Sequence, residues 1–251
     1  MEVANVVNYT YYTLVLALLF VIIVVNLNYK LNLNLEFFQN KETGINRISG
    51  IIYINLDSRE DRKENTKQLF ESIGTNNNKI HRISAIHTPK NGHKGCSQSH
   101  ILALELAKSN NWDTTIIFED DAKLNCSPDE FNSKLNEVLD TSIDYDMIIL
   151  STVNKKLHPD ESNNTKLLKR LYSSTTATCY IITKHYITKL QNLFKDCDKK
   201  MTHEKWGEND GWEPNAIDQR WSELSKVDNW YGLETDLVKQ SGTWSNINKR
   251  K

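Results

Sequence analysis

Short apolar runs rich in β-branched residues alternate along this chain with longer segments whose apolar residues recur at helical spacing. The pattern predicts strands over residues 50–56, 79–86, 114–118, 146–151 and 178–183. It predicts helices over residues 61–73, 97–109 and 184–194, the second of them capped by Ser97. Such alternation predicts an α/β fold in which helices cover both faces of a mostly parallel sheet.

The N-terminus departs from this pattern. No charged residue occurs between Glu2 and Lys30, and residues 14–25 are uninterrupted apolar. Because about 20 apolar residues can cross a bilayer as a helix, we expect residues 1–30 to be a retained single-pass membrane anchor. A cleaved signal peptide is the main alternative, and the absence of Lys and Arg ahead of the apolar run disfavours it.

Residues 31–48 are predicted to be a linker or stem, and residues 49–251 a folded domain. The sequence leaves open on which side of the membrane this domain lies. The basic residues Lys30, Lys41 and Arg47 follow the anchor, which favours a cytoplasmic domain. A sequon such as that at Asn163 would be usable only in a secretory lumen.

Charge and cysteine content exclude several classes of protein. The 31 basic and 32 acidic residues nearly cancel, so we expect no nucleic-acid partner. The four cysteines contain no C-x-x-C pair, which excludes zinc-ribbon and thioredoxin-like sites.

Three consecutive carboxylates, Glu119, Asp120 and Asp121, follow the predicted strand 114–118. Ligands of open α/β sheets bind beyond the carboxyl ends of the strands. In extended backbone Glu119 and Asp121 point to one side and Asp120 to the other. A divalent cation that prefers oxygen ligands, Mg²⁺ or Mn²⁺, would relieve the repulsion among them. The alternative is a solvated strand end without a ligand.

Four stretches and a fainter fifth resemble glycosyltransferase family 25, which includes bacterial lipooligosaccharide glycosyltransferases and procollagen galactosyltransferases. They occur in the order of the family: IIYINLDSREDR (51–62), GCSQSHILALELA (95–107), TTIIFEDDAKL (114–124), TTATCYIITKHYITKL (175–190) and DLVKQSGTWSNI (236–247). The resemblance extends over about residues 50 to 247. It implies a GT-A-like domain that binds a nucleotide sugar, preceded here by the N-terminal transmembrane helix.

In this family an acidic motif holds Mn²⁺ against the diphosphate of the donor. The resemblance places that motif on the triplet, with Asp121 as the first metal ligand, Glu119 as the next and Asp120 in the donor site. Mn²⁺, or Mg²⁺, would stabilise the charge that grows on the leaving nucleoside diphosphate.

Further donor-binding residues are expected on two other segments. Asn55, Arg59 and Arg62 follow the first predicted strand and match the opening motif of the family, and an arginine fork suits phosphate. Ser99 and His100 lie where we expect a helix to begin, and free amides at a helix N-terminus attract anions. The alternatives are local ion pairs, caps and a satisfied core histidine.

An inverting transfer needs a base for the acceptor hydroxyl. Asp218 follows an apolar pair, matches an acidic position of the family and is the first candidate, with Asp210 and Glu213 as alternatives. The surrounding residues 201–221 are rich in carboxylates and tryptophans, a combination suited to sugar recognition.

The sequence therefore predicts a membrane-anchored, metal-dependent glycosyltransferase. We expect a UDP-sugar donor, carrying galactose or glucose, and a glycan, a lipid-linked molecule such as lipooligosaccharide, or a protein hydroxyl as the acceptor. A Mg²⁺-dependent phosphatase is disfavoured because the first predicted strand does not end in Asp-x-Asp. A non-catalytic sugar-binding or scaffold relative would keep the fold, but it would normally lose part of the acidic triplet.

Overall fold

The computed structural model describes residues 18–30, 42–201 and 213–242. The chain divides into two compact units, residues 1–42 and 43–251. The first unit contains a helix over residues 18–30, on which large apolar side chains such as Leu18, Phe20 and Ile23 are exposed.

Among the described residues, no helix combines the length and the apolarity that a membrane crossing requires. The predicted anchor over residues 1–30 is only partly described, because residues 1–17 lie outside the described residues. The membrane anchor therefore stays a prediction.

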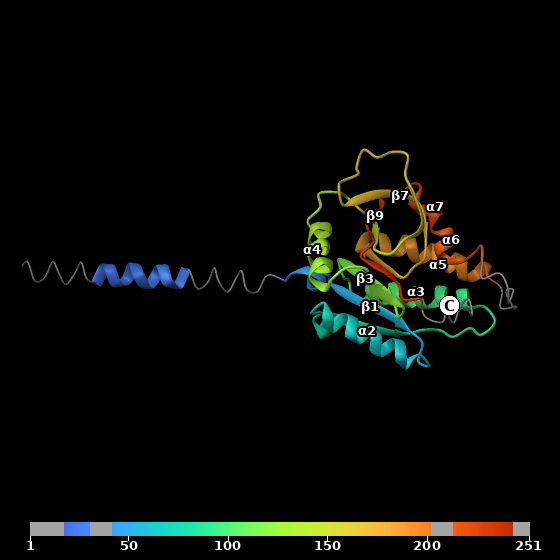
Figure 1. Ribbon diagram of the computed structural model, residues 1–251, viewed down its shortest axis with the longest axis horizontal. Coiled ribbons are helices and arrows are strands. Elements are labelled where there is room, and N and C mark those ends of the chain that lie inside the picture. The colour runs from blue at the N-terminus through green and yellow to red at the C-terminus, as the bar shows by residue number, and fades with distance from the viewer. Residues whose placement is uncertain (1–17, 31–41, 202–212, 243–251) are drawn as a thin grey trace, which may run out of the picture. The chain divides into compact units, whose positions relative to one another are not determined.

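The described part of the second unit is an α/β domain (Figure 1). Its strands are β1 (Gly50–Asn55), β2 (Ile80–Ser84), β3 (Thr114–Glu119), β4 (Ala122–Leu124), β5 (Met147–Ile149), β6 (Val153–Leu157), β7 (Leu168–Thr175), β8 (Cys179–Thr183), β9 (Trp230–Leu233) and β10 (Val238–Gln240). Its α-helices are α2 (Glu60–Ser72), α3 (Gly92–Ser109), α4 (Pro128–Leu139), α5 (Ile187–Lys200), α6 (Ile217–Arg220) and α7 (Ser222–Ser225). Short 3-10 turns are η1 (Gly44–Arg47), η2 (Asn77–Lys79) and η3 (Lys184–Tyr186).

The described strands form an eight-stranded sheet in the order β2-β1-β3-β8-β5-β9-β7-β6 and a two-stranded sheet of β10 and β4. β1 is parallel to β2 and β3, and β5 is parallel to β9, whereas β8 and β7 run against their neighbours. Six of the eight described strands thus share one direction, and the sheet is mixed but largely parallel. Parallel neighbours need a long crossover, which α2 and α3 supply between β1, β2 and β3. β8 follows β7 after a short loop without a helix.

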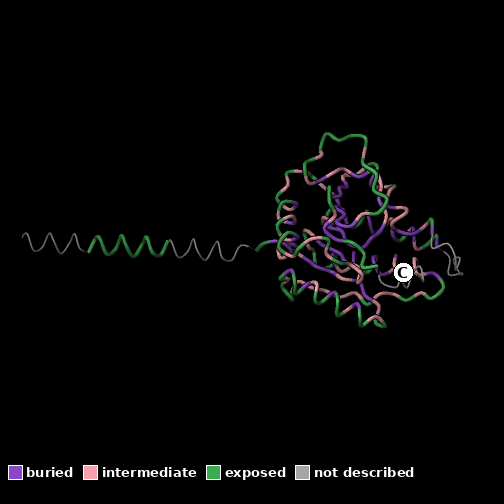
Figure 2. Tube along the Cα trace, viewed as in Figure 1, coloured by how far each residue is buried: buried purple, intermediate pink, exposed green. Residues whose placement is uncertain are grey.

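Helices cover both faces of the sheet, as predicted. Ala103 of α3 and Leu190 of α5 pack on one face with Ile52 of β1. Phe70 of α2 and Phe131 of α4 pack on the other face in a second buried cluster. In Figure 2, much of the trace along the central strands is coloured as buried, whereas the loop between β6 and β7 is mostly exposed.

The register of the sheet brings three strand ends together. Ile54 of β1 pairs with Glu119 of β3, and Asn55 pairs with Ser84 of β2. The residues that follow each strand therefore meet at one edge of the sheet, which is where the acidic triplet lies.

Candidate active site

A cavity of about 190 Å³ lies at the carboxyl ends of β1, β2 and β3. Its walls also come from the first turns of α3, the loop between β7 and β8, and α6. Seven predicted site residues, all in the described part of the chain, line it: Arg62, Ser99, His100, Glu119, Asp120, Asp121 and Asp218. Asn55 and Arg59 are not among the described residues that line the cavity.

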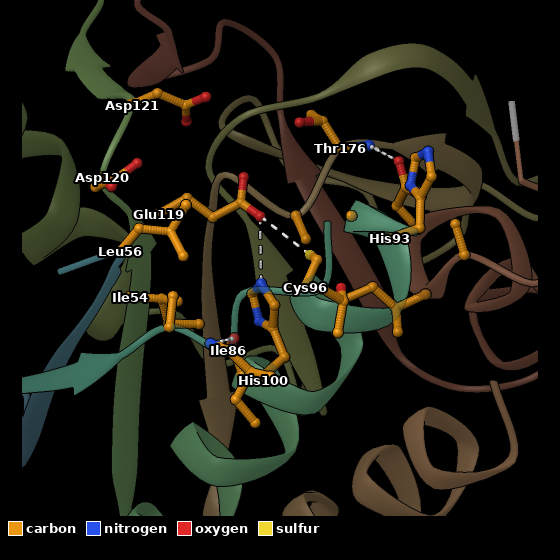
Figure 3. Close-up of a pocket in the computed structure, with 18 of the residues that line it drawn as sticks. Ile54, Leu56, Ile86, His93, Cys96, His100, Glu119, Asp120, Asp121 and Thr176 are labelled. Atoms are coloured by element: carbon orange, nitrogen blue, oxygen red, sulfur yellow. Dashed lines mark hydrogen bonds and ion pairs between the residues drawn. The ribbon is translucent and has the colours of Figure 1, made fainter. Parts of the chain in front are cut away.

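Glu119 ends β3 and points across the cavity toward α3 (Figure 3). Its Oε1 lies 3.3 Å from Nε2 of His100 and accepts from the thiol of Cys96 at 3.5 Å. Its Oε2 accepts from Oγ1 of Thr178 at 3.5 Å. Burial acts to raise the pKa of Glu119, but the hydrogen bond and charge of His100, together with Cys96 and Arg62, outweigh it, and the net shift is downward.

Asp120 lies in the turn after β3 rather than in extended backbone, and it also lines the cavity. Its Oδ1 accepts from Arg62 of α2 at 2.7 Å, and its Oδ2 accepts from Nδ2 of Asn55 at 2.8 Å. The side chains of Arg62 and Asp120 are 9% and 10% exposed, so the ion pair is largely shielded from water. Asp120 thus joins the ends of β1 and β3 to α2.

Asp121 has fewer partners than its two neighbours. Its Oδ2 lies 3.7 Å from Arg62, and its Oδ1 is buried without a hydrogen-bond partner among the described residues. Burial, followed by repulsion from Glu119, raises the pKa of Asp121 to about 7, against the attraction of Arg62. A buried carboxylate oxygen without a partner is costly unless a ligand occupies it.

Helix α3 begins earlier than the sequence predicted, and Ser97 is not its cap. Asn91 is the N-cap, and its side chain accepts from the backbone N–H of Lys94 at 3.2 Å. Ser99 and His100 therefore lie inside the helix, and the expectation that free amides at these residues bind an anion is wrong. Ser99 instead donates to the carbonyl of Gly95 and accepts from the backbone N–H of Ile86. Both side chains still line the cavity.

Arg59 and Asn55 have local partners on the rim. Arg59 forms a bidentate ion pair with Asp61 at 2.8 to 2.9 Å. Asn55 is 1% exposed, and its Oδ1 accepts from Arg82 at 2.9 Å. These contacts fit the alternative that local pairs organise the start of α2.

Asp218 lies on α6 and lines the cavity. Its Oδ2 accepts from the backbone N–H of Thr176 at 2.9 Å. Burial is the main cause that raises the pKa of Asp218, and Glu119 adds to it, whereas the Thr176 amide and His93 oppose it. Thr176 has φ of 76°, a strained conformation for a β-branched residue.

His93 and Thr176 are among the cavity residues that were not predicted from the sequence. His93 lines the cavity with a buried Nε2 that has no partner among the described residues, and Thr176 contributes its strained backbone. No apolar period marks either residue, because Thr176 lies in a loop and His93 lies in the polar first turn of α3. Of the alternative bases, Glu213 is 2% exposed and accepts from Asn91, while Asp210 lies outside the described residues.

The chain is similar to several solved structures, including the following three. The mannose-1-phosphate geranyltransferase of Thermus thermophilus is 7% identical with a TM-score of 0.43, covering 75% of this chain and 74% of that chain. A glycosyltransferase involved in the glycosylation of the major capsid of PBCV-1 is 12% identical with a TM-score of 0.40, covering 80% and 95%. The glycosyltransferase GlyE of Streptococcus pneumoniae TIGR4 is 7% identical with a TM-score of 0.38, covering 80% and 55%.

The family assignment rests on a sequence comparison. No curated protein matches the chain. The family model described as glycosyltransferase family 25 (LPS biosynthesis protein) matches residues 90–204, a range that begins just before α3 and includes the acidic triplet and β8. The chain therefore carries a glycosyltransferase family 25 domain over residues 90–204.

Proposed function

We propose that this protein is a metal-dependent hexosyltransferase with a GT-A-type donor site. It would move galactose or glucose from a UDP-sugar to a hydroxyl of a glycan, a lipid-linked molecule or a protein. The observation that carries this proposal is Asp121, whose buried Oδ1 lacks a partner among the described residues and which lines the same cavity as Glu119 and Asp218.

The acidic residues fit a hard divalent cation. Asp121 offers a carboxylate oxygen that has no hydrogen-bond partner among the described residues, and Glu119 supplies a second carboxylate from the same strand end. Oxygen ligands of this kind suit Mn²⁺ or Mg²⁺. The cation would supply Lewis-acid stabilisation of the diphosphate leaving group. Asp120 is held by Arg62 and Asn55, so its role is to fix the strand end that presents the two ligands.

Another residue that lines the cavity is suited to proton transfer. Asp218 is the proposed base, since its carboxylate faces the cavity and is oriented by the Thr176 amide. A raised pKa makes a carboxylate a stronger base once it is deprotonated. Arg62 also lines the cavity and adds positive charge near the site proposed for the diphosphate.

Hydrolysis of UDP-galactose and UDP-glucose by the full-length protein tests the proposal. We expect turnover with Mn²⁺, its loss with a chelator, and recovery when Mn²⁺ is restored. Asp121→Asn should lower kcat by about 100-fold or more, because an electrostatic contribution to the transition state is removed. Asp113→Asn is the matched control, since Asp113 precedes β3 and its side chain is 87% exposed.

Donor binding separates this proposal from the non-catalytic alternative. Calorimetry that detects UDP-sugar binding without hydrolysis or transfer would favour a sugar-binding relative. Turnover that survives both the chelator and Asp121→Asn would exclude the proposed metal site.

A further inference from the structure

A second group of potential metal ligands lies beside Asp121. Cys96 and His100 are four residues apart on α3, so they share one face of the helix, and both point toward Glu119 (Figure 3). One ligand atom from each of these three residues, a thiol sulfur, an imidazole nitrogen and a carboxylate oxygen, lies within 4.8 Å of the other two.

The separations suit a tetrahedral ion. Zinc binds nitrogen and oxygen at about 2.0 Å and sulfur at about 2.3 Å, which places neighbouring tetrahedral ligands about 3.3 to 3.6 Å apart. Oε1 of Glu119 lies 3.3 Å from Nε2 of His100 and 3.5 Å from Sγ of Cys96. Small rotations of these side chains would close the set around one ion.

The surroundings of His100 also suit a metal ligand. The hydroxyl of Tyr180 lies 2.9 Å from Nδ1, which leaves Nε2 directed toward Glu119. Metal-binding histidines commonly donate the other ring N–H to such an oxygen, which fixes the tautomer. The ring of Tyr180 is stacked on that of His100 at 5.7 Å. The imidazole is therefore oriented by a partner on β8 as well as by its own helix.

We propose that Cys96, His100 and Glu119 form a binding site for a soft divalent cation such as Zn²⁺, distinct from the Mn²⁺ or Mg²⁺ position at Asp121. On binding, the thiol of Cys96 releases its proton to solvent, and the imidazole keeps a proton on Nδ1, where the Tyr180 oxygen accepts it. Because Cys96, His100 and Glu119 line the cavity, a water or ligand oxygen can complete the coordination.

The two positions share Glu119. Sulfur and nitrogen ligands favour Zn²⁺ or Co²⁺, whereas carboxylates alone favour Mg²⁺ or Mn²⁺. An ion on Cys96 and His100 draws Oε1 of Glu119 toward α3 and away from Asp121. The proposed site does not depend on sugar transfer, so it stands or fails separately from the proposed function.

Titration of the full-length protein with Co²⁺ tests this site. We expect a thiolate-to-cobalt charge-transfer band that saturates at a single equivalent and that Zn²⁺ abolishes by displacement. Cys96→Ser should remove the band, whereas Cys126→Ser should retain it, since Cys126 packs against the cluster on the other face of the sheet. Asp121→Asn should also retain it. Tyr180→Phe should weaken Co²⁺ binding by about 10-fold or more, as expected for loss of a partner of a ligand.

Alkylation of the unmodified protein tests metal binding at Cys96 even when Cys96→Ser does not fold. Zn²⁺ should slow alkylation of Cys96, followed by peptide mass, by about 10-fold or more, and Mg²⁺ should not. A missing charge-transfer band, or a band that persists in folded Cys96→Ser, would overturn the assignment. The three side chains would then be joined by hydrogen bonds only. Equal alkylation rates with and without Zn²⁺ would overturn it as well.

Discussion

Each carboxylate of the acidic triplet meets a different environment, although the three are adjacent in the sequence. Glu119 contacts α3, Asp120 contacts Arg62 and Asn55, and Asp121 keeps a buried oxygen without a partner among the described residues. The alternation of an extended strand does not account for these environments, because β3 ends at Glu119 and Asp120 lies in the turn that follows. It could not predict the partners, because Arg62 and His100 arrive from helices distant in sequence.

At the residue scale, we expect Asp218, the proposed base, to contribute to the pH dependence of transfer. The base is active only when it is deprotonated, and burial raises the pKa of Asp218. We therefore expect kcat to fall as the pH drops through this raised pKa, with a midpoint above the usual value of about 3.9 for aspartate. Transfer rates across a pH series, at saturating donor and acceptor, measure this limb.

Asp218→Asn should abolish transfer at every pH while leaving UDP-sugar binding in place. Glu223→Gln is its control, since Glu223 is 54% exposed and pairs with Arg220. Transfer by Asp218→Asn at the native rate would assign the base to another residue.

At the scale of elements, sequence patterns identified β1, β2, β3, β5 and β8. They did not identify the remaining described strands, including β9, whose four residues are all buried. β1, β3 and β8 are apolar runs and were predicted to within two residues. β6 is fully exposed with the sequence VNKKL, so no buried face imposes a pattern on it. Its pairing with β7 is set by the rest of the sheet.

Helix α4 was also missed, although its start follows known rules. Ser127 caps it by accepting from the backbone N–H of Glu130 at 3.2 Å, Pro128 occupies the first turn, and two acidic residues follow. Ser127→Ala should lower the free energy of unfolding in urea by about 1 kcal/mol, because this backbone N–H loses its partner.

Ser133→Ala is the matched control on the exposed side of the same helix. It should change the free energy of unfolding by less than about 0.5 kcal/mol. Equal effects of the two substitutions would show that the cap contributes nothing specific.

At the scale of the whole molecule, the sequence predicted an α/β domain and the place of its site, because strand ends of a parallel sheet meet at one edge. The start of α3 was misplaced, since the first turn of that helix contains Gly92 and polar residues that give no apolar period. Thr176 reaches the cavity from a loop and His93 from that first helical turn, so neither follows an apolar period.

Attachment to a membrane is also a property of the whole molecule. The helix over residues 18–30 exposes apolar side chains along its length, including Leu19 and Ile22. We expect the full-length protein to stay in the membrane pellet after an alkaline carbonate wash. Leu19→Arg with Ile22→Arg should release it, because each central arginine costs about 2.5 to 3.5 kcal/mol on insertion.

Asn28→Arg is the control, since a charge at the end of a span can reach the interface. Recovery of the native protein in the carbonate supernatant would contradict the predicted anchor.

The order of strands in the sheet also influences the order in which parts of the domain fold. β1, β2 and β3 are consecutive in the chain, whereas β5 pairs with β9 through Met147 and Trp230. Contacts between nearby segments lose less chain entropy on closing, so the β1–β2–β3 layer is favoured to assemble first. During synthesis, the wall that carries Glu119 and Asp121 can thus be in place before the segment that carries Asp218 has left the ribosome.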